Sequence, residues 1–354
     1  MSTRMKILIT GGAGYIGSHT CLELLRAGYE IVVLDNFSNA DPAGLARVEA
    51  AVGRPIRIYE GDLCDRRLLE QIFEQNEIAG VIHFAALKYI DRSFADPAGY
   101  YQTNVSGTIT LLAVMRQHHC RNLVFSSSAS VYGIPRQNPL TEETPLAECT
   151  NPYARTKRID ELFLKDLCRA EAQMQVIALR YFNPAGADPD GVIGEDSLAG
   201  GGSLMTAVTR TAAGMQPELD VFGTDYPTCD GTGVRDYIHV CDLARAHILA
   251  LQKLLPQENA KTDGASGTSE GGFHLYNMGT GQGCSVLQLV QAFERVNGVP
   301  IPLRFRTRRS GDVASCWCDA SKAERELGWK AVYGIEDMCR DAWNWEKSKR
   351  GKAE

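Results

Sequence analysis

The sequence lacks a regular cysteine pattern and any long apolar run. Its 354 residues include eleven scattered cysteines, and the closest pair, Cys316 and Cys318, has no second pair that would complete a zinc site. We therefore expect no bound metal, and thiols used this freely are typical of a reducing compartment. No stretch approaches the roughly 20 apolar residues of a membrane-spanning helix, and residues 1–6 do not resemble a signal peptide. These absences predict a soluble, cytoplasmic protein that has no membrane partner.

An excess of positive charge is missing as well. The chain has 37 Lys and Arg against 43 Asp and Glu, which gives a formal net charge of −6 at pH 7. Nucleic acids and anionic membranes are bound mainly by clustered cations, so neither is an expected partner. An anionic small molecule needs only a few local arginines and stays possible. The hydrophobic content of 44% is ordinary for a globular chain, and the length allows one large α/β unit plus a smaller lobe.

Short apolar runs alternate with helical patterns in the first half of the chain. We expect strands at residues 6–10, 30–34, 81–84, 122–125 and 176–181, and helices at 65–74, 97–117 and 152–171. Strands and helices in alternation predict an α/β fold with a doubly wound parallel Rossmann sheet. The polar, Gly/Ser-rich residues 257–272 are expected to be an exposed loop insertion without a function.

The alternation loosens in the second half, where turn-forming residues become frequent. We assign residues 1–182 to the Rossmann domain, with 236–278 partly returning to it. Residues 183–235 and 279–354 are expected to form a smaller C-terminal α/β lobe that binds the substrate.

A glycine-rich loop at residues 10–17 stands between the first expected strand and a helical pattern. Its glycines are Gly11, Gly14 and Gly17. This spacing suits a tight turn, a close backbone approach to a pyrophosphate, and close packing of the helix on the strand. Asp35 ends the next strand, where its carboxylate would accept hydrogen bonds from ribose hydroxyls and repel a 2′-phosphate. The pattern therefore predicts NAD rather than NADP, with Asp62 placed to meet the adenine.

Tyr153 and Lys157 lie one helical turn apart, downstream of that loop. The spacing alone indicates little, because any amphipathic helix places residues four apart on one face. Behind a dinucleotide loop, the tyrosine hydroxyl can take a proton from an alcohol while a nicotinamide accepts the hydride. A lysine one turn away can lower the tyrosine pKa and hold the cofactor ribose. Serines 126–128 follow a buried strand, and one of them is expected to hydrogen-bond the reacting hydroxyl. The chain is predicted to be a redox enzyme.

Six segments together resemble the UDP-glucose 4-epimerase family of the extended short-chain dehydrogenase/reductase superfamily. The resemblance runs nearly end to end, and it is carried by residues 10–19, 81–88, 125–128, 180–184, 231–240 and 308–312. It implies an isomerase that interconverts UDP-glucose and UDP-galactose by transient oxidation to a 4-keto sugar, with NAD as cofactor. By analogy with the family, it also implies a homodimer packed through two helices of the first domain.

The resemblance assigns roles to individual residues. It implies that Tyr153 is the catalytic base, Ser128 its hydrogen-bonding partner, and Lys157 the cation that lowers the tyrosine pKa and binds ribose. The implied cofactor contacts are Gly11, Gly14, Tyr15, Ile16, Gly17, Asp35, Asn36, Asp62, Leu63, Phe84, Lys88, Asn104, Tyr153 and Lys157. The implied UDP-sugar contacts are Ser128, Asn183, Ser203, Leu204, Phe222, Arg235, Tyr237, Arg309, Asp312 and Cys316. The planar fork of arginine suits a diphosphate and stays charged at any working pH.

Three places differ from the family pattern or vary within it. Gly201-Gly202-Ser203 stand where the family usually has Pro-Asn-Asn, so Ser203 is expected to replace an asparagine contact to the sugar. Residues 89–92 are bulkier and more charged than is usual. Cys316 aligns with a position where a tyrosine tends to exclude N-acetylated sugars and a small residue admits them. We therefore expect activity on UDP-GlcNAc and UDP-GalNAc; the alternative is a buried core thiol, with Tyr89 or another side chain filling the space.

Two other functions compete with epimerisation. A nucleotide-sugar 4,6-dehydratase of the same superfamily must also expel the 6-hydroxyl, and such enzymes carry Thr-Asp-Glu before Val-Tyr-Gly. This chain has Ser128-Ala129-Ser130 there, so it has no carboxylate for the elimination. A non-catalytic, NAD-sensing scaffold would have little reason to retain Ser128, Tyr153 and Lys157 together.

Overall fold

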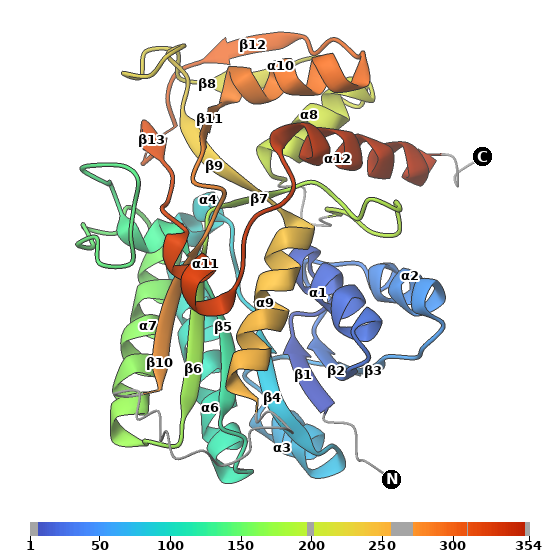
Figure 1. Cartoon of the computed structure of the whole chain (residues 1–354), viewed down its shortest axis with the longest axis vertical. Helices are drawn as coiled ribbons and strands as arrows, with labels where there is room; N and C mark the ends of the chain where they lie inside the picture. The colour runs from blue at the N-terminus through green and yellow to red at the C-terminus, as the bar shows by residue number, and fades with distance from the viewer. Residues whose placement is uncertain (1–5, 197–201, 256–271, 310, 351–354) are drawn as a thin grey trace.

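A large parallel sheet forms the base of the molecule. The computed structural model describes residues 6–196, 202–255, 272–309 and 311–350, and in these the sheet has seven strands in the order β3-β2-β1-β4-β5-β6-β10 (Figure 1). The strands are β1 (Lys6–Thr10), β2 (Glu30–Asp35), β3 (Arg57–Glu60), β4 (Ile78–His83), β5 (Asn122–Ser128), β6 (Gln175–Tyr181) and β10 (Phe273–Met278). The strand order reverses beside β1, which creates a crevice at the carboxyl ends of β1 and β4. The predicted doubly wound α/β fold is confirmed.

Helices cover both faces of this sheet. One face carries α1 (Tyr15–Arg26), α2 (Ala43–Val52), α9 (Val240–Leu254) and α11 (Ser321–Leu327), and the other carries α3 (Arg66–Gln75), α6 (Gly107–Gln117) and α7 (Pro152–Ala170). Successive strand residues point to opposite faces, so Ile7 and Ile9 pack into one apolar core and Leu8 into the other. Burial on both faces explains why these strands are nearly continuous apolar runs in the sequence.

A smaller lobe lies above the carboxyl ends of the large sheet (Figure 1). It contains β7 (Asn183–Ala185), β9 (Val234–His239), β11 (Gly283–Ser285) and β13 (Ser315–Cys316) in one sheet, and β8 (Leu219–Phe222) with β12 (Leu303–Arg306) in another. Its helices are α8 (Leu204–Ala212), α10 (Val286–Asn297) and α12 (Ile335–Arg350). Val208, Phe293 and Met338 are fully or almost fully buried in its core.

Residues 236–278 were expected to return partly to the first domain. In the structure β9 pairs with β7, β11 and β13 in the smaller lobe, whereas α9 packs on the large sheet and β10 joins it. Conversely, α11 contacts α9 and β10 of the large unit, although it falls within residues 279–354, which were assigned to the smaller lobe. The division into two binding units stays a prediction, and the loop expected at 257–272 lies almost wholly outside the described residues.

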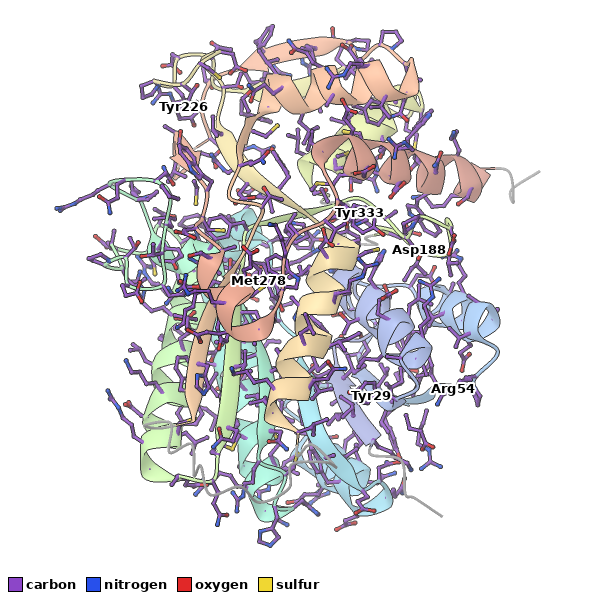
Figure 2. All side chains as sticks on the ribbon, viewed as in Figure 1. Tyr29, Arg54, Asp188, Tyr226, Met278 and Tyr333 are labelled. Atoms are coloured by element: carbon purple, nitrogen blue, oxygen red, sulfur yellow. The ribbon has the colours of Figure 1, made fainter. Side chains whose placement is uncertain are left out.

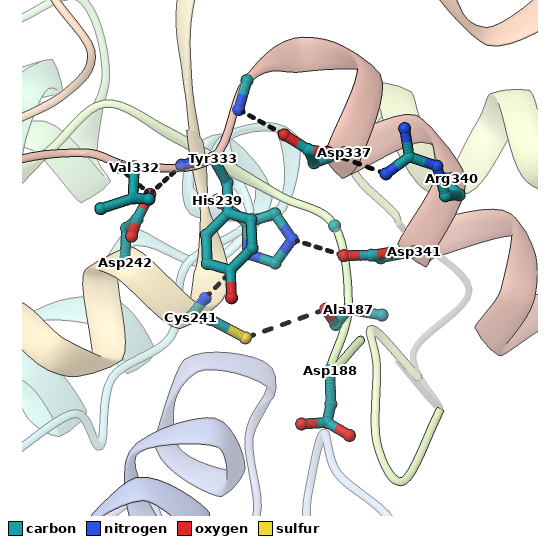
Figure 3. A network of polar contacts seen from close by, with 12 residues as sticks. Ala187, Asp188, His239, Cys241, Asp242, Val332, Tyr333, Asp337, Arg340 and Asp341 are labelled. Atoms are coloured by element: carbon teal, nitrogen blue, oxygen red, sulfur yellow. Dashed lines mark hydrogen bonds and ion pairs between the residues drawn. The ribbon is translucent and has the colours of Figure 1, made fainter. Parts of the chain in front are cut away.

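A polar network ties the lobes together where β9 passes into α9 (Figure 3). The ring of His239 is fully buried, and its Nε2 lies 3.2 Å from Asp341 Oδ2 on α12. The ring of Tyr333 stacks on it at a centroid distance of 4.4 Å. Asp242 accepts hydrogen bonds from the backbone N–H groups of Val332 and Tyr333, at 2.8 and 2.9 Å. Figure 2, which draws the side chains, shows Asp188 and Tyr333 at this level between the two lobes.

The remaining short elements frame the crevice. They are α4 (Ile90–Ala95), α5 (Pro97–Tyr100), a π-helix η1 (Tyr101–Ser106) and a 3₁₀-helix η2 (Ala129–Tyr132). The predicted helix at 97–117 is thus a continuous run of α5, η1 and α6. None of the described helices is long and apolar enough to cross a membrane.

Candidate active site

The glycine loop packs too tightly for side chains. A Cβ on Gly11, whose φ is +72°, would lie 2.6 Å from the backbone nitrogen of Ala85. A Cβ on Gly17 would lie 2.3 Å from the carbonyl oxygen of Gly11. Gly14 caps α1 without a side-chain hydrogen bond, and the first turn contains no acidic residue. The helix amides at this end therefore face the crevice with their positive dipole end, which fits the pyrophosphate of a dinucleotide.

Asp35 lies at the carboxyl end of β2, beside this loop. Its oxygens accept hydrogen bonds from the backbone N–H groups of Ala13 and Phe37, both at 2.9 Å. Burial raises the pKa of the carboxyl group, and these two hydrogen bonds oppose the rise. A carboxylate offers about four lone-pair sites, so it retains capacity for ribose hydroxyls. Asn36 follows and donates to Asp62 at 3.0 Å, which brings two further predicted cofactor contacts together, with Leu63 buried behind them.

The loop after β4 forms the other wall of the crevice. The N–H of Phe84 donates to the Thr10 carbonyl at 2.9 Å, and the Phe84 ring packs on His247. Asn104 is buried and donates to the Leu87 carbonyl and to Thr156 Oγ1, so both amide hydrogens are used within the protein. Its position therefore fixes the loop against α7, and a cofactor contact through these hydrogens would have to break one of the two bonds.

Two more predicted cofactor residues make contacts toward the smaller lobe. The hydroxyl of Tyr15 donates to the Gly186 carbonyl at 2.7 Å, while Ile16 packs against the core under α1. Lys88 Nζ lies 3.9 Å from Glu195 Oε1. The sequence analysis missed Glu195, which also accepts hydrogen bonds from Ser203 and Thr206. Nothing in its local pattern distinguishes it from a surface carboxylate.

Ser128, Tyr153 and Lys157 come together at the end of β5. Ser128 ends the strand and accepts hydrogen bonds from the N–H and the hydroxyl of Ser130, at 3.2 and 2.9 Å. Asn151 caps α7 by accepting from the N–H of Ala154 at 2.8 Å, so the first turn of the helix carries Tyr153. A hydrogen bond joins Tyr153 to Ser128.

The electrostatics of Tyr153 differ from the sequence prediction. Burial raises the pKa of the tyrosine, and the hydrogen bond to Ser128, rather than Lys157, opposes the rise. The reason is that the ammonium of Lys157 donates to the Ser126 carbonyl at 2.8 Å and lies over the Phe125 ring. Lys157 is only 3% exposed, and burial lowers its pKa.

A buried ion pair supports the floor of this site. Arg180 on β6 donates to both oxygens of Glu161 on α7, at 2.9 and 2.6 Å. Ser127 donates to the same carboxylate. Because such a bidentate pair fixes two side chains in one geometry, it anchors α7 to β5 and β6 directly beneath Tyr153 and Lys157.

The smaller lobe brings five predicted substrate residues together: Phe222, Arg235, Arg309, Asp312 and Cys316. Arg309 lies over the Phe222 ring, 3.9 Å from its centroid, and Arg235 donates to Asp312 at 3.3 Å. Cys316 pairs with Arg235 in the β13–β9 ladder. Two guanidinium groups with access to this region can bind a diphosphate through paired N–H donors.

The other predicted substrate residues are placed less favourably. Asn183 is exposed on β7 and pairs with Tyr237, but Tyr237 itself is buried in the lobe core. Leu204 begins α8 and is partly buried. The hydroxyl of Ser203 caps this helix and donates to Glu195 at 2.5 Å, so it is already engaged within the protein. Its oxygen also accepts from the N–H of Thr206 at 3.3 Å, so the expected contact to the sugar has only one acceptor lone pair of Ser203 left to use.

Comparison with known proteins agrees with this geometry. The family model described as GDP-mannose 4,6 dehydratase matches residues 8–342. The UDP-glucose 4-epimerase of Bacillus subtilis is 51% identical, over 97% of both chains. The structure of UDP-glucose 4-epimerase from Bifidobacterium longum in complex with NAD+ and UDP has a TM-score of 0.91 and 44% identity, and covers 98% of this chain and 99% of its own. The UDP-Glc/GlcNAc 4-epimerase of Campylobacter jejuni has a TM-score of 0.80 and 35% identity, with 97% and 99% covered.

The matching family model is described as a dehydratase, whereas the relatives are epimerases. The residues after β5 distinguish between these two activities. Ser128, Ala129 and Ser130 place hydroxyl and methyl groups where an elimination would need a carboxylic acid. The end-to-end identity with the curated relatives is also far above what a shared fold requires. The chain belongs to the UDP-glucose 4-epimerase family.

Proposed function

We propose that the protein catalyses the NAD-dependent, reversible 4-epimerisation of UDP-glucose and UDP-galactose through a transient 4-keto sugar. The observation that carries this proposal is the meeting of Ser128, Tyr153 and Lys157 beside a glycine loop shaped for a dinucleotide. The solved neighbour that holds NAD+ and UDP supports the same pair of ligands. The arginines of the smaller lobe supply the anchors that a nucleoside diphosphate needs.

The residues divide the chemistry between them. Tyr153, as phenolate, accepts the proton of the 4-hydroxyl, while Ser128 orients both groups through its hydrogen bonds. NAD, when bound along the glycine loop and Asp35, supplies reversible hydride chemistry at carbon 4. Arg235 and Arg309 hold the diphosphate while the sugar turns within the site. Once the opposite face of the 4-keto carbon is presented, Tyr153 returns the proton to the same oxygen as the hydride would return to carbon 4, so that neither a proton nor a hydride is gained or lost over the cycle.

We expect the purified protein to carry NAD and to convert UDP-galactose to UDP-glucose without added cofactor, because the reaction consumes no net hydride. The test is to heat-denature the protein, measure nucleotide in the supernatant, and follow the sugar nucleotides by chromatography. As a control, a second sample is dialysed against a compound that competes with NAD for its site before it is denatured and assayed. Turnover that depends stoichiometrically on fresh NAD would contradict the proposal.

We also propose that the N-acetylated pair, UDP-GlcNAc and UDP-GalNAc, is interconverted. Cys316 is half-buried beside Arg235, and it packs against the apolar cluster that follows Ser128. A thiol there occupies much less volume than a phenol and leaves space for an acetamido group. The alternative that Tyr89 fills this space is weakened, because its hydroxyl donates to Asn39 on the other side of the crevice at 3.0 Å.

Replacing Cys316 with Tyr should lower turnover of the acetylated pair by about tenfold or more and spare UDP-galactose, because overfilling penalises the larger sugar more. Initial rates on both pairs, measured on the same preparation, give the ratio directly. Cys284→Tyr is a control for a bulky change at another half-buried thiol of the same lobe. If wild type does not turn over UDP-GalNAc at saturating concentration, Cys316 does not admit the acetylated sugars.

A homodimer in the cytoplasm is the assembly that we propose. Ile109 on α6 and Ile159 and Leu162 on α7 expose 44%, 37% and 57% of their surface on one side of the large sheet. A second copy that packs there would bury these apolar side chains. All eleven cysteines are free thiols, which supports a reducing compartment. Light scattering of the purified protein distinguishes a dimer from a monomer.

A further inference from the structure

Asp160 is a buried carboxyl group that the mechanism above does not use. It lies on α7, three residues after Lys157 and seven after Tyr153, so all three share one face of the helix. Asp160 is only 1% exposed, and neither of its oxygens accepts a hydrogen bond from any described residue. An ionised carboxylate in such a place is costly unless a nearby cation compensates it.

The titratable groups around Asp160 and Lys157 come from their own helix and from two strands of the large sheet. On its own helix are Lys157 and Glu161, both of which act on it electrostatically. Glu161 is already matched by Arg180 from β6 through two hydrogen bonds. From β4, His83 lies near Lys157, but its ring is held by the hydroxyls of Thr10 and Thr108, and burial lowers its pKa to about 3, so it is neutral.

Lys157 is therefore the cation left for Asp160. Among the described residues its ammonium donates to the Ser126 carbonyl, and that carbonyl carries no full charge. Burial lowers the pKa of Lys157, whereas Asp160 and then Glu161 oppose that effect. Burial raises the pKa of Asp160, and Lys157 opposes that rise in turn. Two groups that interact in this way lose their protons as a pair.

We propose that Asp160 is a positioning residue for Lys157: once ionised, its buried carboxylate is the negative charge that keeps Lys157 an ammonium. The inference rests on the proposed function, because it concerns how long Lys157 stays charged beside Tyr153 as the pH rises. It requires no change in which residues contact the substrate.

Asp160→Asn separates this role from a packing role. Asparagine has nearly the same shape as the protonated acid but cannot become a carboxylate, so Lys157 loses the negative charge that favours its ammonium form. The alkaline limb of the kcat profile should therefore move to lower pH by about one unit, the shift typical of one nearby opposite charge. At the acid end the two proteins should have equal kcat, because the wild-type side chain is itself protonated there.

A second readout does not depend on turnover. The folded-state pKa of Asp160 is raised above its unfolded value, so its contribution to stability is fully present below about pH 4 and is lost as the pH rises through the folded-state value of about 8. Asp160→Asn should therefore have the same Tm as wild type near pH 4 and a higher Tm at pH 8. UDP affinity should not change, since Arg235 and Arg309 lie in the smaller lobe.

The experiment measures kcat on UDP-galactose and bound NAD from pH 5 to 9.5, and Tm from pH 4 to 9.5, for wild type, Asp160→Asn and Asp166→Asn. Asp166 lies on the same helix with 72% of its side chain exposed, and it serves as the matched control with an unchanged profile. An inactive wild type would contradict the proposed function instead. An active wild type whose profile coincides with that of Asp160→Asn would overturn the inference, and a uniform loss of kcat at all pH values would indicate a packing role and overturn it as well.

Discussion

Tyr153→Phe should lower kcat by about 10²–10⁴-fold, the contribution typical of general acid–base catalysis by one positioned side chain. The substitution removes a single hydroxyl from a half-buried ring and leaves its packing in place. A hydrogen bond joins that hydroxyl to Ser128. UDP affinity should remain close to wild type, because Arg235 and Arg309 lie in the smaller lobe and keep their contacts.

Rates on UDP-galactose and UDP titrations by calorimetry, on the same preparation, separate the two effects. Tyr29→Phe is the matched control, since Tyr29 lies at the far end of the large sheet, away from the crevice (Figure 2). It should have wild-type kcat. If Tyr153→Phe retained near-normal turnover, another group would have to accept the proton, and the base assigned to Tyr153 would be wrong.

The parts of the site that sequence predicts are those carried by one continuous segment. The glycine loop, Asp35 and the Tyr153–Lys157 pair each depend on a local pattern whose structure is fixed by one strand or one helix. Their meeting at one end of the sheet follows from parallel strand order, because the carboxyl ends of such strands share an edge. Sequence was sufficient here because neighbouring residues set the geometry.

The contacts that sequence did not predict depend on how the lobes meet. Glu195 contacts Lys88 and Ser203 only because residues from both lobes converge there, and the absence of hydrogen bonds to Asp160 from the described residues depends on how α7 packs. Tyr237 has the pattern of a binding residue but packs into the lobe core. The direction in which the Lys157 ammonium points determines its effect on the pKa of Tyr153. That direction likewise depends on tertiary packing and cannot be predicted from the local sequence.

The short strands of the smaller lobe show the same limit. β7 and β11 have three residues each and β13 has two, which is too short for an alternating pattern to appear. Their partner β9 belongs to the smaller lobe, although it directly precedes the helix α9, which packs on the large sheet. Pairing in the smaller lobe is decided by residues far apart in the chain.

Gly17→Ala should remove the cofactor from the purified protein. The added Cβ would lie 2.3 Å from the Gly11 carbonyl oxygen and 2.9 Å from Gly12 Cα, and neither backbone atom can move without displacing the loop. Overpacking costs up to about 3 kcal/mol, which corresponds to about a 100-fold loss of NAD affinity. Nucleotide released on heating and turnover with excess NAD measure the loss, and partial recovery of turnover at high NAD is expected.

Gly44→Ala tests whether the loss comes from the loop or from any added methyl group on this face. Gly44 lies in α2, where a Cβ would meet no atom within 4 Å, and alanine is the better helix former. It should retain bound NAD and have equal or higher Tm. Because both substitutions add the same methyl group, a Gly17→Ala protein that folds and still retains NAD would show that the loop is not where the pyrophosphate binds.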